Sequence, residues 1–438
     1  MTDRAVTVAD EVVQLAAELI RIDTTNTGDT ATGAGERLAA EYVAEKLSDV
    51  GIASQLIESE PGRTSLVARI PGRDRNRGGL VMHGHLDVVP AVAADWQVDP
   101  FAGEIRDGYL WGRGAVDMKN MDAMILAVVR QWAREGRIPP RDIVLAFFAD
   151  EEAGGKLGAK YVVGRHPELF DGCTEAVGEV GGFSITLAEG RRIYPIMTGE
   201  KGLAWTRLTA RGRAGHGSMV HPDNAVTALA ETVARIGRHE FAVRLGPTVA
   251  AFLRQAATAL GVPFDEADPA GIVAKLGSAS RLIGATLCHT ANPTMLEAGY
   301  KTNVVPGRAQ AVIDCRVLPG AEKEFEAELD ALLGPDVSRE WLVYSPPLEI
   351  EPYQPLMNLM VNCLTEADPG ATVAPYLLSG GTDAKSLAQL GISCYGFAPL
   401  QLPADLDFTA LFHGVDERVS LQALRFGVGV LDTFLARC

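Results

Sequence analysis

Apolar residues in the first part of the chain follow two different spacings. Residues 10–22 place apolar side chains on one helical stripe, which predicts an amphipathic helix with Asp10 as its N-cap. Residues 35–50 predict a second helix that ends at Gly51. The run at 142–149 is almost entirely apolar, which is typical of a strand in the middle of a sheet. Strands that alternate with helices in this way predict an α/β sheet with helices on both faces.

The hydrophobic pattern changes near Thr198. Residues 202–212 alternate between polar and apolar side chains, as expected for a strand with one exposed face. The stretch 247–287 predicts irregular and partly helical structure. Further strands and helices are predicted at 224–236, 294–299, 309–317, 322–333 and 340–344. Together these segments predict an α+β unit of four strands and two helices with one insertion.

The α/β pattern returns after the proline pair at 346–347. At 438 residues the chain is too long for one hydrophobic core. We therefore predict that residues 198–346 form a unit inserted between segments 1–197 and 347–438, which fold together. An edge strand of the inserted unit could pair with a second copy of the chain, so we also predict a homodimer.

The composition narrows the classes of partner. The chain has 40 Lys and Arg against 56 Asp and Glu, a net charge of −16, and no clustered basic face, which argues against nucleic-acid binding. No apolar run approaches the ~18 residues of a membrane span, and the N-terminus lacks the apolar core of a signal peptide. The six cysteines include no Cys-x-x-Cys pair, so we expect a reducing compartment and predict a cytoplasmic location.

A histidine and an aspartate lie near the ends of regular elements, where open α/β sheets place ligand-binding groups. His85 follows an apolar strand at 80–83, and Asp117 precedes a helix that begins near residue 121. His85 could bind a metal ion through one ring nitrogen while Asp87 accepts a hydrogen bond from the other. Taken alone, the His-x-Asp pattern also fits a structural histidine, so the assignment depends on the rest of the chain.

Three more metal-ligand residue types follow strands or turns of the same unit. Glu152 follows the apolar strand, Glu179 follows a second short apolar run, and His413 lies in a loop near the C-terminus. With the histidine and aspartate above, they suit two divalent cations about 3.5–4 Å apart that share one carboxylate and hold a bridging water. Glu151 points differently from its neighbour and is free to act as a general base. The alternative for this Glu-Glu pair is a solvated acidic turn.

Eight short motifs resemble, in the same order, those of one enzyme family. They are HGHLDVVP (83–90), GRGAVDMK (112–119), DEE (150–152), GE (178–179), GHGS (215–218), TNVVP (302–306), SGGTD (379–383) and HGVDE (413–417). The chain resembles the dinuclear zinc peptidase family that includes acetylornithine deacetylase, succinyl-diaminopimelate desuccinylase, aminoacylase and bacterial glutamate carboxypeptidase. The resemblance implies a zinc-peptidase catalytic domain with a mixed α/β sheet, interrupted by an inserted α+β lid and dimerisation domain.

The resemblance also implies how the metal ligands divide. Asp117 would bridge two divalent metal ions. His85 and Glu179 would complete one site, and Glu152 and His413 the other. Zinc is the expected metal, although cobalt and manganese suit such sites as well.

Catalytic roles follow from the same resemblance. Glu151 would be the general base, and Asp87 would orient the histidine ligand. His216 would cross a dimer interface and stabilise the oxyanion in the partner's active site. The alternative for His216 is a histidine in a glycine-rich turn. The peptide bond between Asp117 and Met118 is expected to be cis.

Candidates to hold the free carboxylate of a substrate lie in the inserted unit and in the SGGTD turn. Asn303 and Arg316 are two of them, because an arginine fork matches a carboxylate. The amides of Gly380 and Gly381 and the hydroxyl of Thr382 could act in the same way from a helix N-terminus. For Arg316 the alternative is a surface salt bridge.

The implied activity is metal-dependent hydrolysis of a peptide or N-acyl amide bond next to a free carboxylate, as by a carboxypeptidase or an aminoacylase. The small-molecule substrate would be a dipeptide or an N-acyl amino acid. Within the family, succinyl-diaminopimelate desuccinylase is the alternative, and a metal-dependent binding protein without catalysis is the alternative of another class. A serine hydrolase is disfavoured because the chain has no Gly-x-Ser-x-Gly elbow.

Overall fold

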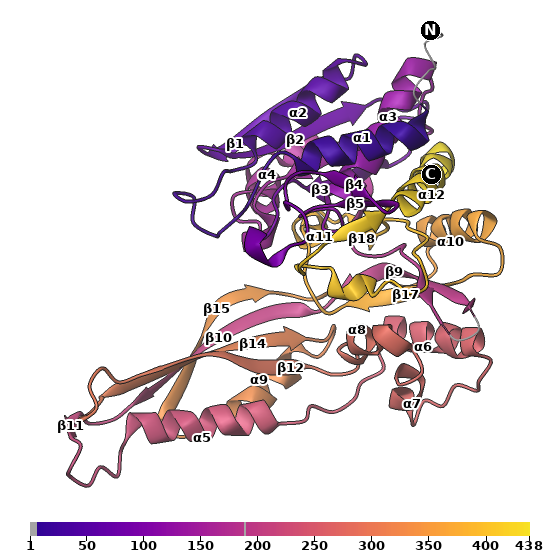
Figure 1. Cartoon of the computed structure of the whole chain (residues 1–438). Coiled ribbons are helices and arrows are strands. Elements are labelled where there is room, and N and C mark those ends of the chain that lie inside the picture. The colour runs from indigo at the N-terminus through magenta and orange to yellow at the C-terminus, as the bar shows by residue number, and fades with distance from the viewer. Residues whose placement is uncertain (1–6, 188–189) are drawn as a thin grey trace.

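The computed structural model describes residues 7–187 and 190–438 of the chain. Figure 1 shows two parts, which we call the α/β lobe and the arm. The α/β lobe contains the first described residues, from Thr7 on, and the C-terminal residues. The arm is the four-stranded sheet that extends away from it, together with the helices on that sheet. No helix in the described ranges combines the length and apolar character needed to cross a membrane.

The α/β lobe is built on a mixed sheet of ten strands. Parallel pairs join β3 to β6 and β7, and β7 to β18, whereas β1, β2 and β6 pair antiparallel. Every residue of β3 and β6 is buried, so both faces of the sheet are covered. Across the sheet lie β1 (Ser54–Glu60), β2 (Arg63–Ile70), β6 (Ile143–Phe148), β3 (Gly79–His85), β7 (Cys173–Gly178), β18 (Ser393–Gly396), β9 (Arg192–Glu200) and β16 (Leu348–Glu349), with β17 (Thr372–Leu378) and β8 (Ile185–Thr186) also paired to β9.

Helices pack on this sheet in two groups. In one, α1, α3 and α12 contact one another, and α2 lies against β1 and β2; in the other, α11 contacts α4, β7 and β18. The first helix begins at Val8 and is capped by the Thr7 side chain, so the prediction of Asp10 as N-cap was wrong. The bounds are α1 (Val8–Ile20), α2 (Arg37–Ser48), α3 (Lys119–Glu135), α4 (Ala159–Arg165), α10 (Pro355–Ala367), α11 (Ala384–Ala388) and α12 (Leu421–Arg437).

A small antiparallel sheet flanks the lobe. The hairpin of β4 (Glu104–Arg106) and β5 (Tyr109–Trp111) turns at Asp107 and Gly108, both of which have positive φ. A third strand, β19 (Arg418–Ser420), pairs with β5 and so joins the C-terminal segment to this hairpin.

Strand β9 was not predicted from the sequence. Its run, RIYPIMTGE, contains Pro195 and Gly199, and both residues weaken a strand pattern. In the fold it pairs in parallel with β17 and also contacts β18, β16 and β8. Only Lys201 separates its last residue from the first strand of the arm, so the chain passes directly from one sheet into the other.

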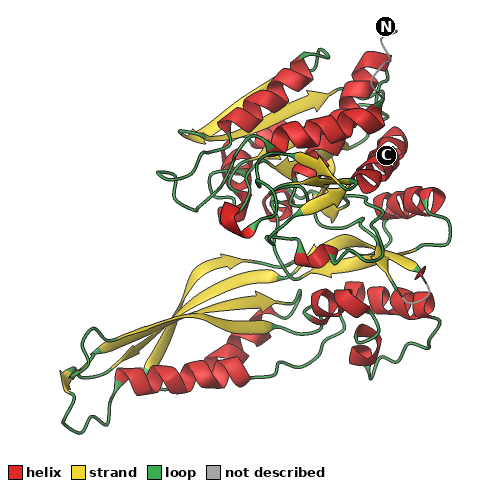
Figure 2. Cartoon of the chain, in the orientation of Figure 1, coloured by secondary structure: helices red, strands yellow, loops and turns green. Residues whose placement is uncertain are grey.

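The arm is an antiparallel sheet in the order β12-β14-β10-β15. It has its own hydrophobic core, and α5 lies along β10, β12 and β14 (Figures 1 and 2). Four strands and two helices were predicted here, and the strand expected at 294–299 begins earlier. The elements are β10 (Gly202–Arg211), β12 (Thr290–Ala298), β14 (Arg308–Val317), β15 (Val337–Ser345), α5 (Ala225–Arg238) and α9 (Glu322–Ala331), with the short pair β11 (Gly215–His216) and β13 (Val304–Val305) at the distal end.

The segment 247–287 is more regular than the sequence suggested. It forms α6 (Pro247–Leu260), α7 (Pro269–Val273) and α8 (Ser280–Gly284). Helix α6 contacts β17 and β9, and its buried residues belong to the core of the α/β lobe. This segment therefore packs with the lobe although it lies between strands of the arm in sequence. The domain limits at 197 and 346 stay a prediction.

Candidate metal centre

The site begins where β3 ends. His85 is the last residue of this fully buried strand and is 1% exposed. Its Nδ1 lies 3.0 Å from the Asp87 main-chain oxygen and 3.5 Å from Asp87 Oδ1. A donor on Nδ1 leaves the lone pair on Nε2, which is the atom that points toward the other site residues.

Asp87 connects this histidine to the Glu151-Glu152 turn. Its Oδ1 accepts a hydrogen bond from the Glu151 amide at 3.0 Å, and its Oδ2 accepts one from the Glu152 amide at 3.0 Å. Asn26 Nδ2 donates to the same Oδ2 at 2.8 Å. One fully buried carboxylate thus fixes both the end of β3 and the turn after β6.

Asp117 lies between the two histidines. Its Oδ1 is 3.0 Å from His85 Nε2, and its Oδ2 is 3.3 Å from His413 Nε2. Glu179 Oε2 lies 3.6 Å from His85 Nε2, and Glu152 Oε2 lies 3.1 Å from His413 Nε2. The five side chains form two groups of three that share Asp117, with the ligand atoms of each group within 4.8 Å of one another.

The electrostatics of these groups fit bound cations. Burial alone would raise the pKa of Asp117, but the adjacent His413 and His85 imidazoles hold it below its usual range. Burial raises the pKa of Glu179 to about 7 and also raises that of Glu152. Glu152 Oε1 is buried without a hydrogen-bond partner. Three carboxylates next to two imidazoles, with one buried carboxylate oxygen left without a donor, are a donor set for divalent metal ions.

Glu417, for which no role was predicted, fixes the loop of residues 114–117. Glu417 is fully buried and accepts hydrogen bonds from the amides of Val116 at 2.6 Å, Asp117 at 3.1 Å and Gly114 at 3.1 Å. It also pairs with Arg113 at 2.7 Å. Burial raises the pKa of Glu417 to about 7, although Arg113 opposes this. The C-terminal segment that carries His413 therefore also fixes the backbone next to Asp117.

Comparison with known proteins gives the family of this fold and site. A model of the peptidase family M20/M25/M40 matches residues 81–437. The chain belongs to this family. It is therefore a metallohydrolase, and the resemblance seen in the motifs is confirmed.

The M20 chain is similar to curated and solved proteins over most of its length. Aminoacylase-1 of Sus scrofa is 28% identical over 417 residues, 91% of this chain and 89% of that protein. A probable carboxypeptidase S-like 2 of Dictyostelium discoideum is 29% identical over 382 residues, 82% and 71% of the two chains. The crystal structure of the M20 metallo-carboxypeptidase Sso-CP2 from Sulfolobus solfataricus has a TM-score of 0.74 at 19% identity and covers 98% of this chain and 99% of its own. This likeness confirms the predicted fold class.

Glu151 belongs to neither group of three in the M20 centre. It begins a short 3-10 helix, Glu151–Ala153, after Asp150, whose φ of 63° is unusual for a residue other than glycine. Burial raises the pKa of Glu151 well above its usual value, and Glu179 raises it further. The peptide bond between Asp117 and Met118 is cis, as the resemblance implied.

Two predicted site residues lie away from this centre within one M20 chain. His216 forms β11 at the distal end of the arm, where the Gly217 amide donates to the Asn303 oxygen at 2.9 Å (Figure 1). His216 is exposed, and its Nδ1 lies 2.8 Å from Ser218 Oγ. The fold thus brings His216 and Asn303 together, but not with the five clustered side chains.

The candidates near the SGGTD turn differ in what they already contact. Arg316 Nη1 lies 3.5 Å from the Ser379 oxygen, while its Nε and Nη2 donate to Asp314 Oδ1 and Oδ2 at 2.7 and 3.1 Å. The salt bridge considered as the alternative for Arg316 is therefore present, and a substrate carboxylate would have to compete with Asp314. Thr382 is committed elsewhere, because its amide and hydroxyl both donate to buried Glu200, at 3.0 and 2.5 Å. The suggested role of Thr382 in holding a substrate carboxylate is therefore not supported.

Gly380 and Gly381 lie beside that committed threonine. No hydrogen bond of their amides is described, and the helix that follows, α11, has only five residues. The short helix offers too few aligned peptide dipoles for the predicted helix-terminus effect. Any contribution of Gly380 and Gly381 must come from the turn itself.

A polar network behind Asp87 was also missed in the sequence. Asn26 Oδ1 accepts a hydrogen bond from Arg63 Nη2 at 2.8 Å, and Arg63 pairs with the buried carboxylate of Glu36. Asn26 Nδ2 is 3.2 Å from Asp150 Oδ1. All of these side chains are buried, so the turn that carries Glu151 rests on an ordered polar layer. The only signal in the sequence is a polar loop, which does not reveal its partners.

Proposed function

We propose that this M20 protein hydrolyses the amide bond of a dipeptide or an N-acyl amino acid, next to the free carboxylate of the leaving half. One observation carries the proposal. Two groups of three possible metal ligands share Asp117, and Glu151, next to one of these ligands in the chain, belongs to neither group. The likeness to an aminoacylase and to carboxypeptidases supports the same substrate classes.

Each group of three would hold one divalent cation. His85, Asp117 and Glu179 would form one site, and Asp117, Glu152 and His413 the other. Nitrogen and carboxylate donors suit zinc, and cobalt or manganese could replace it. When bound, the two cations supply Lewis-acid activation of a water molecule and of the scissile carbonyl.

The protein's own residues would move the proton. Glu151 would take a proton from the attacking water as the new C–O bond forms. It would then pass this proton to the leaving nitrogen as the C–N bond breaks. Asp87 contributes to this step indirectly, because it accepts a hydrogen bond from the Glu151 amide and so positions the base. Arg316 is the proposed partner of the substrate carboxylate.

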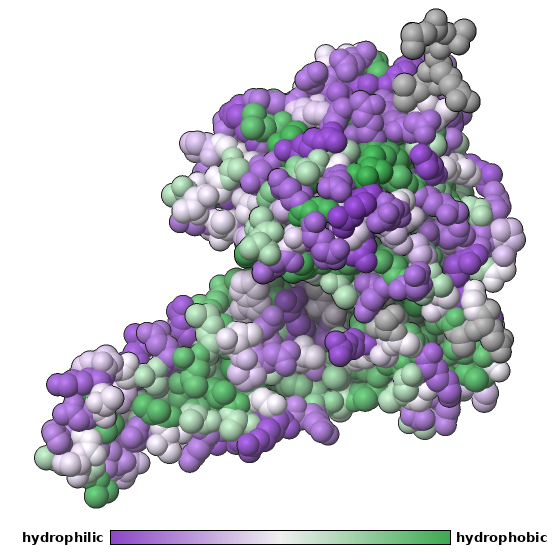
Figure 3. Space-filling model, in the orientation of Figure 1, coloured by the Kyte–Doolittle hydropathy of each residue, from purple (hydrophilic) through white to green (hydrophobic). Residues whose placement is uncertain are grey.

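We further propose that the protein acts as a homodimer in which His216 of a second copy completes each active site. Its exposure at the end of the arm supports this. The arm also exposes Met295 and Leu296 on edge strand β12, and Figure 3 shows apolar residues gathered on the arm. An open edge strand with apolar side chains favours pairing with another copy. The cytoplasmic location stays a prediction.

Substitution Glu151→Gln tests the proposal. The variant should bind the same amount of zinc per chain as the unaltered protein, because Glu151 is in neither group, and should lose about 10²–10⁴-fold in kcat. Activity would be measured on acylated amino acids, N-succinyl substrates and dipeptides, and metal by atomic absorption.

The matched control is Glu168→Gln. The Glu168 side chain is 62% exposed, and its one described polar contact is with His166, so both zinc content and kcat should be unchanged. Undiminished turnover by Glu151→Gln would refute the role of this residue as the base. Turnover of no amide substrate by the zinc-loaded protein would refute the proposed function.

A further inference from the structure

The polar loop that follows α1 is attached to the segment that carries Asp87. Thr25 in this loop forms a parallel β-bridge with Val88. Next to the bridge, the Asn26 amide donates to the Val88 main-chain oxygen at 2.8 Å. The backbone of Asn26 is therefore held at a fixed distance from Asp87, although the two residues are far apart in the sequence.

The side-chain amide of Asn26 has partners at both of its ends. Its Nδ2 donates to Asp87 Oδ2 at 2.8 Å and lies 3.2 Å from Asp150 Oδ1. Its Oδ1 accepts hydrogen bonds from Arg63 Nη2 at 2.8 Å and from the Gly28 amide at 2.9 Å. A guanidinium and a main-chain amide only donate, whereas ionised carboxylates only accept. The side-chain amide can therefore take only this orientation.

The two carboxylates that meet at Asn26 hold the backbone on both sides of Glu151. Asp87 Oδ1 accepts the Glu151 amide at 3.0 Å. Asp150 precedes Glu151 directly, and its Oδ2 accepts the Leu157 amide at 2.8 Å. Asn26 and Asp150 are each 4% exposed, so bulk water does not replace these bonds. One asparagine thus connects two contacts that fix where the turn of Glu151 lies.

An ion pair behind Asn26 holds its amide oxygen. Arg63 contacts the Glu36 carboxylate through Nη1 and Asn26 through Nη2, and both ionised side chains are buried. Because the guanidinium is a planar and rigid fork, fixing one nitrogen at Glu36 also fixes the other at Asn26. The family model matches residues 81–437, so these three residues lie outside the matched part of the chain.

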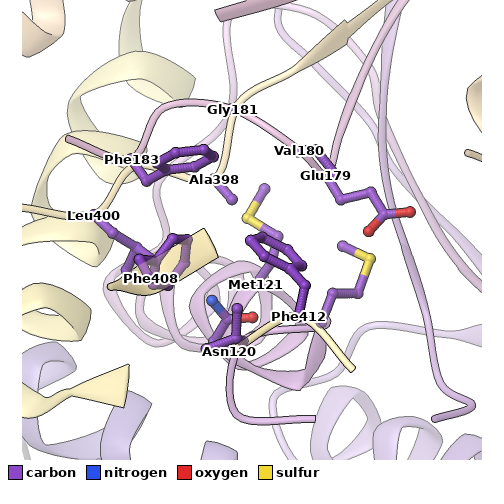
Figure 4. Close-up of a pocket in the computed structure, with 12 residues that line it drawn as sticks. Asn120, Met121, Glu179, Val180, Gly181, Phe183, Ala398, Leu400, Phe408 and Phe412 are labelled. Atoms are coloured by element: carbon purple, nitrogen blue, oxygen red, sulfur yellow. The ribbon is translucent and has the colours of Figure 1, made fainter. Parts of the chain in front are cut away.

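The lining of the centre around Glu179 is different. Figure 4 shows this carboxylate at the edge of a mostly hydrophobic set of residues. Among the residues that line this pocket, only Glu179 is ionisable and only Asn120 has a neutral polar side chain. The described hydrogen bonds that fix the turn of Glu151 therefore come from the side of Asn26.

We propose that Asn26 is a positioning residue for Glu151, and that it acts through Asp87 and Asp150 to keep the base within reach of the attacking water. This inference rests on the proposed function and adds to it a residue outside the eight sequence motifs. The described contacts of the Asn26 side chain include no candidate metal ligand. Its alteration should therefore lower kcat while KM and zinc content stay unchanged.

Substitution Asn26→Asp tests the inference with little change of shape. It keeps one acceptor oxygen, but it supplies at most one hydrogen where the amide nitrogen supplies two. A displacement of about 1 Å can lower a rate by about 100-fold, so kcat of the zinc-loaded protein should fall by about 10–100-fold on an N-acetyl amino acid. KM should change by less than about twofold, because uniform substrate binding is not affected. Zinc per chain should equal that of the unaltered protein.

Hydrogen exchange gives a readout other than turnover. The amides of residues 151 and 152 both donate to Asp87, so they should exchange faster in Asn26→Asp than in the unaltered protein. The control is Asn362→Asp, which alters an exposed asparagine of α10 and should change neither kcat nor this exchange.

A second substitution should restore part of the lost activity. In the double variant Asn26→Asp/Asp150→Asn, an amide nitrogen again faces a carboxylate, with the two groups exchanged between the positions. Its kcat should therefore exceed that of Asn26→Asp, because residues in contact are coupled. Arg63→Lys removes the fork that reaches both Glu36 and Asn26, and it should also lower kcat without changing KM.

The outcomes separate this inference from the proposed function. If Glu151→Gln loses turnover but Asn26→Asp retains it, the inference is overturned and the proposed function stands. The inference is also overturned if Asn26→Asp loses zinc in proportion to kcat, or if the double variant recovers no activity. If Asn26→Asp does not fold, an unchanged kcat in Arg63→Lys overturns it. If Glu151→Gln retains full turnover, both fail.

Discussion

Substitution Glu417→Gln tests how Asp117, the proposed bridging ligand, is held in place. The Glu417 carboxylate is fully buried and accepts four hydrogen bonds, three from the amides of residues 114, 116 and 117 and one from Arg113. Glutamine keeps one acceptor oxygen, and its amide nitrogen would face donors that it cannot satisfy. The Arg113 guanidinium, at 3% exposure, would also lose its counter-charge.

The expected loss of stability follows from the burial of the Glu417–Arg113 ion pair. Removing one partner of a buried ion pair costs about 3–5 kcal/mol, because the other charge is left uncompensated. We expect the free energy of unfolding of the α/β lobe to fall by that amount for Glu417→Gln, measured by urea denaturation. Zinc loaded into the proposed centre should also dissociate faster, because the amide of Asp117 loses its acceptor. A second substitution, Arg113→Met, should recover part of the loss in the double variant.

The control is an ion pair at the surface. Glu340 is 61% exposed and pairs with Arg207 at 2.9 Å, so Glu340→Gln should change stability by no more than about 1 kcal/mol. The reasoning would be refuted if Glu417→Gln were as mild as Glu340→Gln and released zinc at the unaltered rate.

Two further predictions concern the lobe away from the metals. Asp368→Asn should be destabilising at neutral pH, because hydrogen bonds from Arg192 at 2.5 Å and Tyr194 at 2.8 Å lower the pKa of Asp368. Because the pKa of Asp368 is lower in the folded protein, its carboxylate stabilises the fold above about pH 4, and this stabilisation is lost as the pH falls further. The difference in free energy of unfolding between Asp368→Asn and the unaltered protein, measured in urea, should therefore shrink only below about pH 4. Phe252→Ala should cost about 3–5 kcal/mol, because Phe252 is 2% exposed and packs against Tyr376. A loss confined to the unfolding of the arm would contradict its place in the core of the lobe.

Part of this architecture could be predicted because the sequence signals are local. An uninterrupted apolar run such as 142–149 specifies a buried strand, and a ligand-type residue after it lies at the edge of the sheet. The same reasoning located the histidine at the end of β3 and the glutamates after β6. Strand β9 was not predicted because Pro195 and Gly199 interrupt the strand pattern. The strand forms nevertheless, because its pairing with β17 outweighs the low strand propensity of these residues.

Other features could not be predicted because they depend on which distant residues meet. Glu417 looks like an ordinary acidic loop residue until the fold brings it to the amides near Asp117, about 300 positions earlier. Thr382 looked available to a substrate because nothing in the sequence shows that Glu200 occupies its donors. The helices of 247–287 lie inside the inserted segment in sequence, but the apolar face that they cover belongs to the lobe.

Because β9 passes directly into β10, a small rotation at this joint moves the far end of the arm by several ångströms. Lys201 alone separates the two strands, and its ammonium donates to the main-chain oxygens of Ala285 and Cys288, at 2.8 and 2.6 Å. The ten residues of β10 extend about 34 Å at about 3.4 Å per residue, so a rotation of about 10° at this joint would sweep its far tip by about 6 Å. Such a displacement exceeds the length of a hydrogen bond, so the stiffness of this joint, together with the return of the chain from β15 to β16, limits how accurately His216 can be delivered to any target.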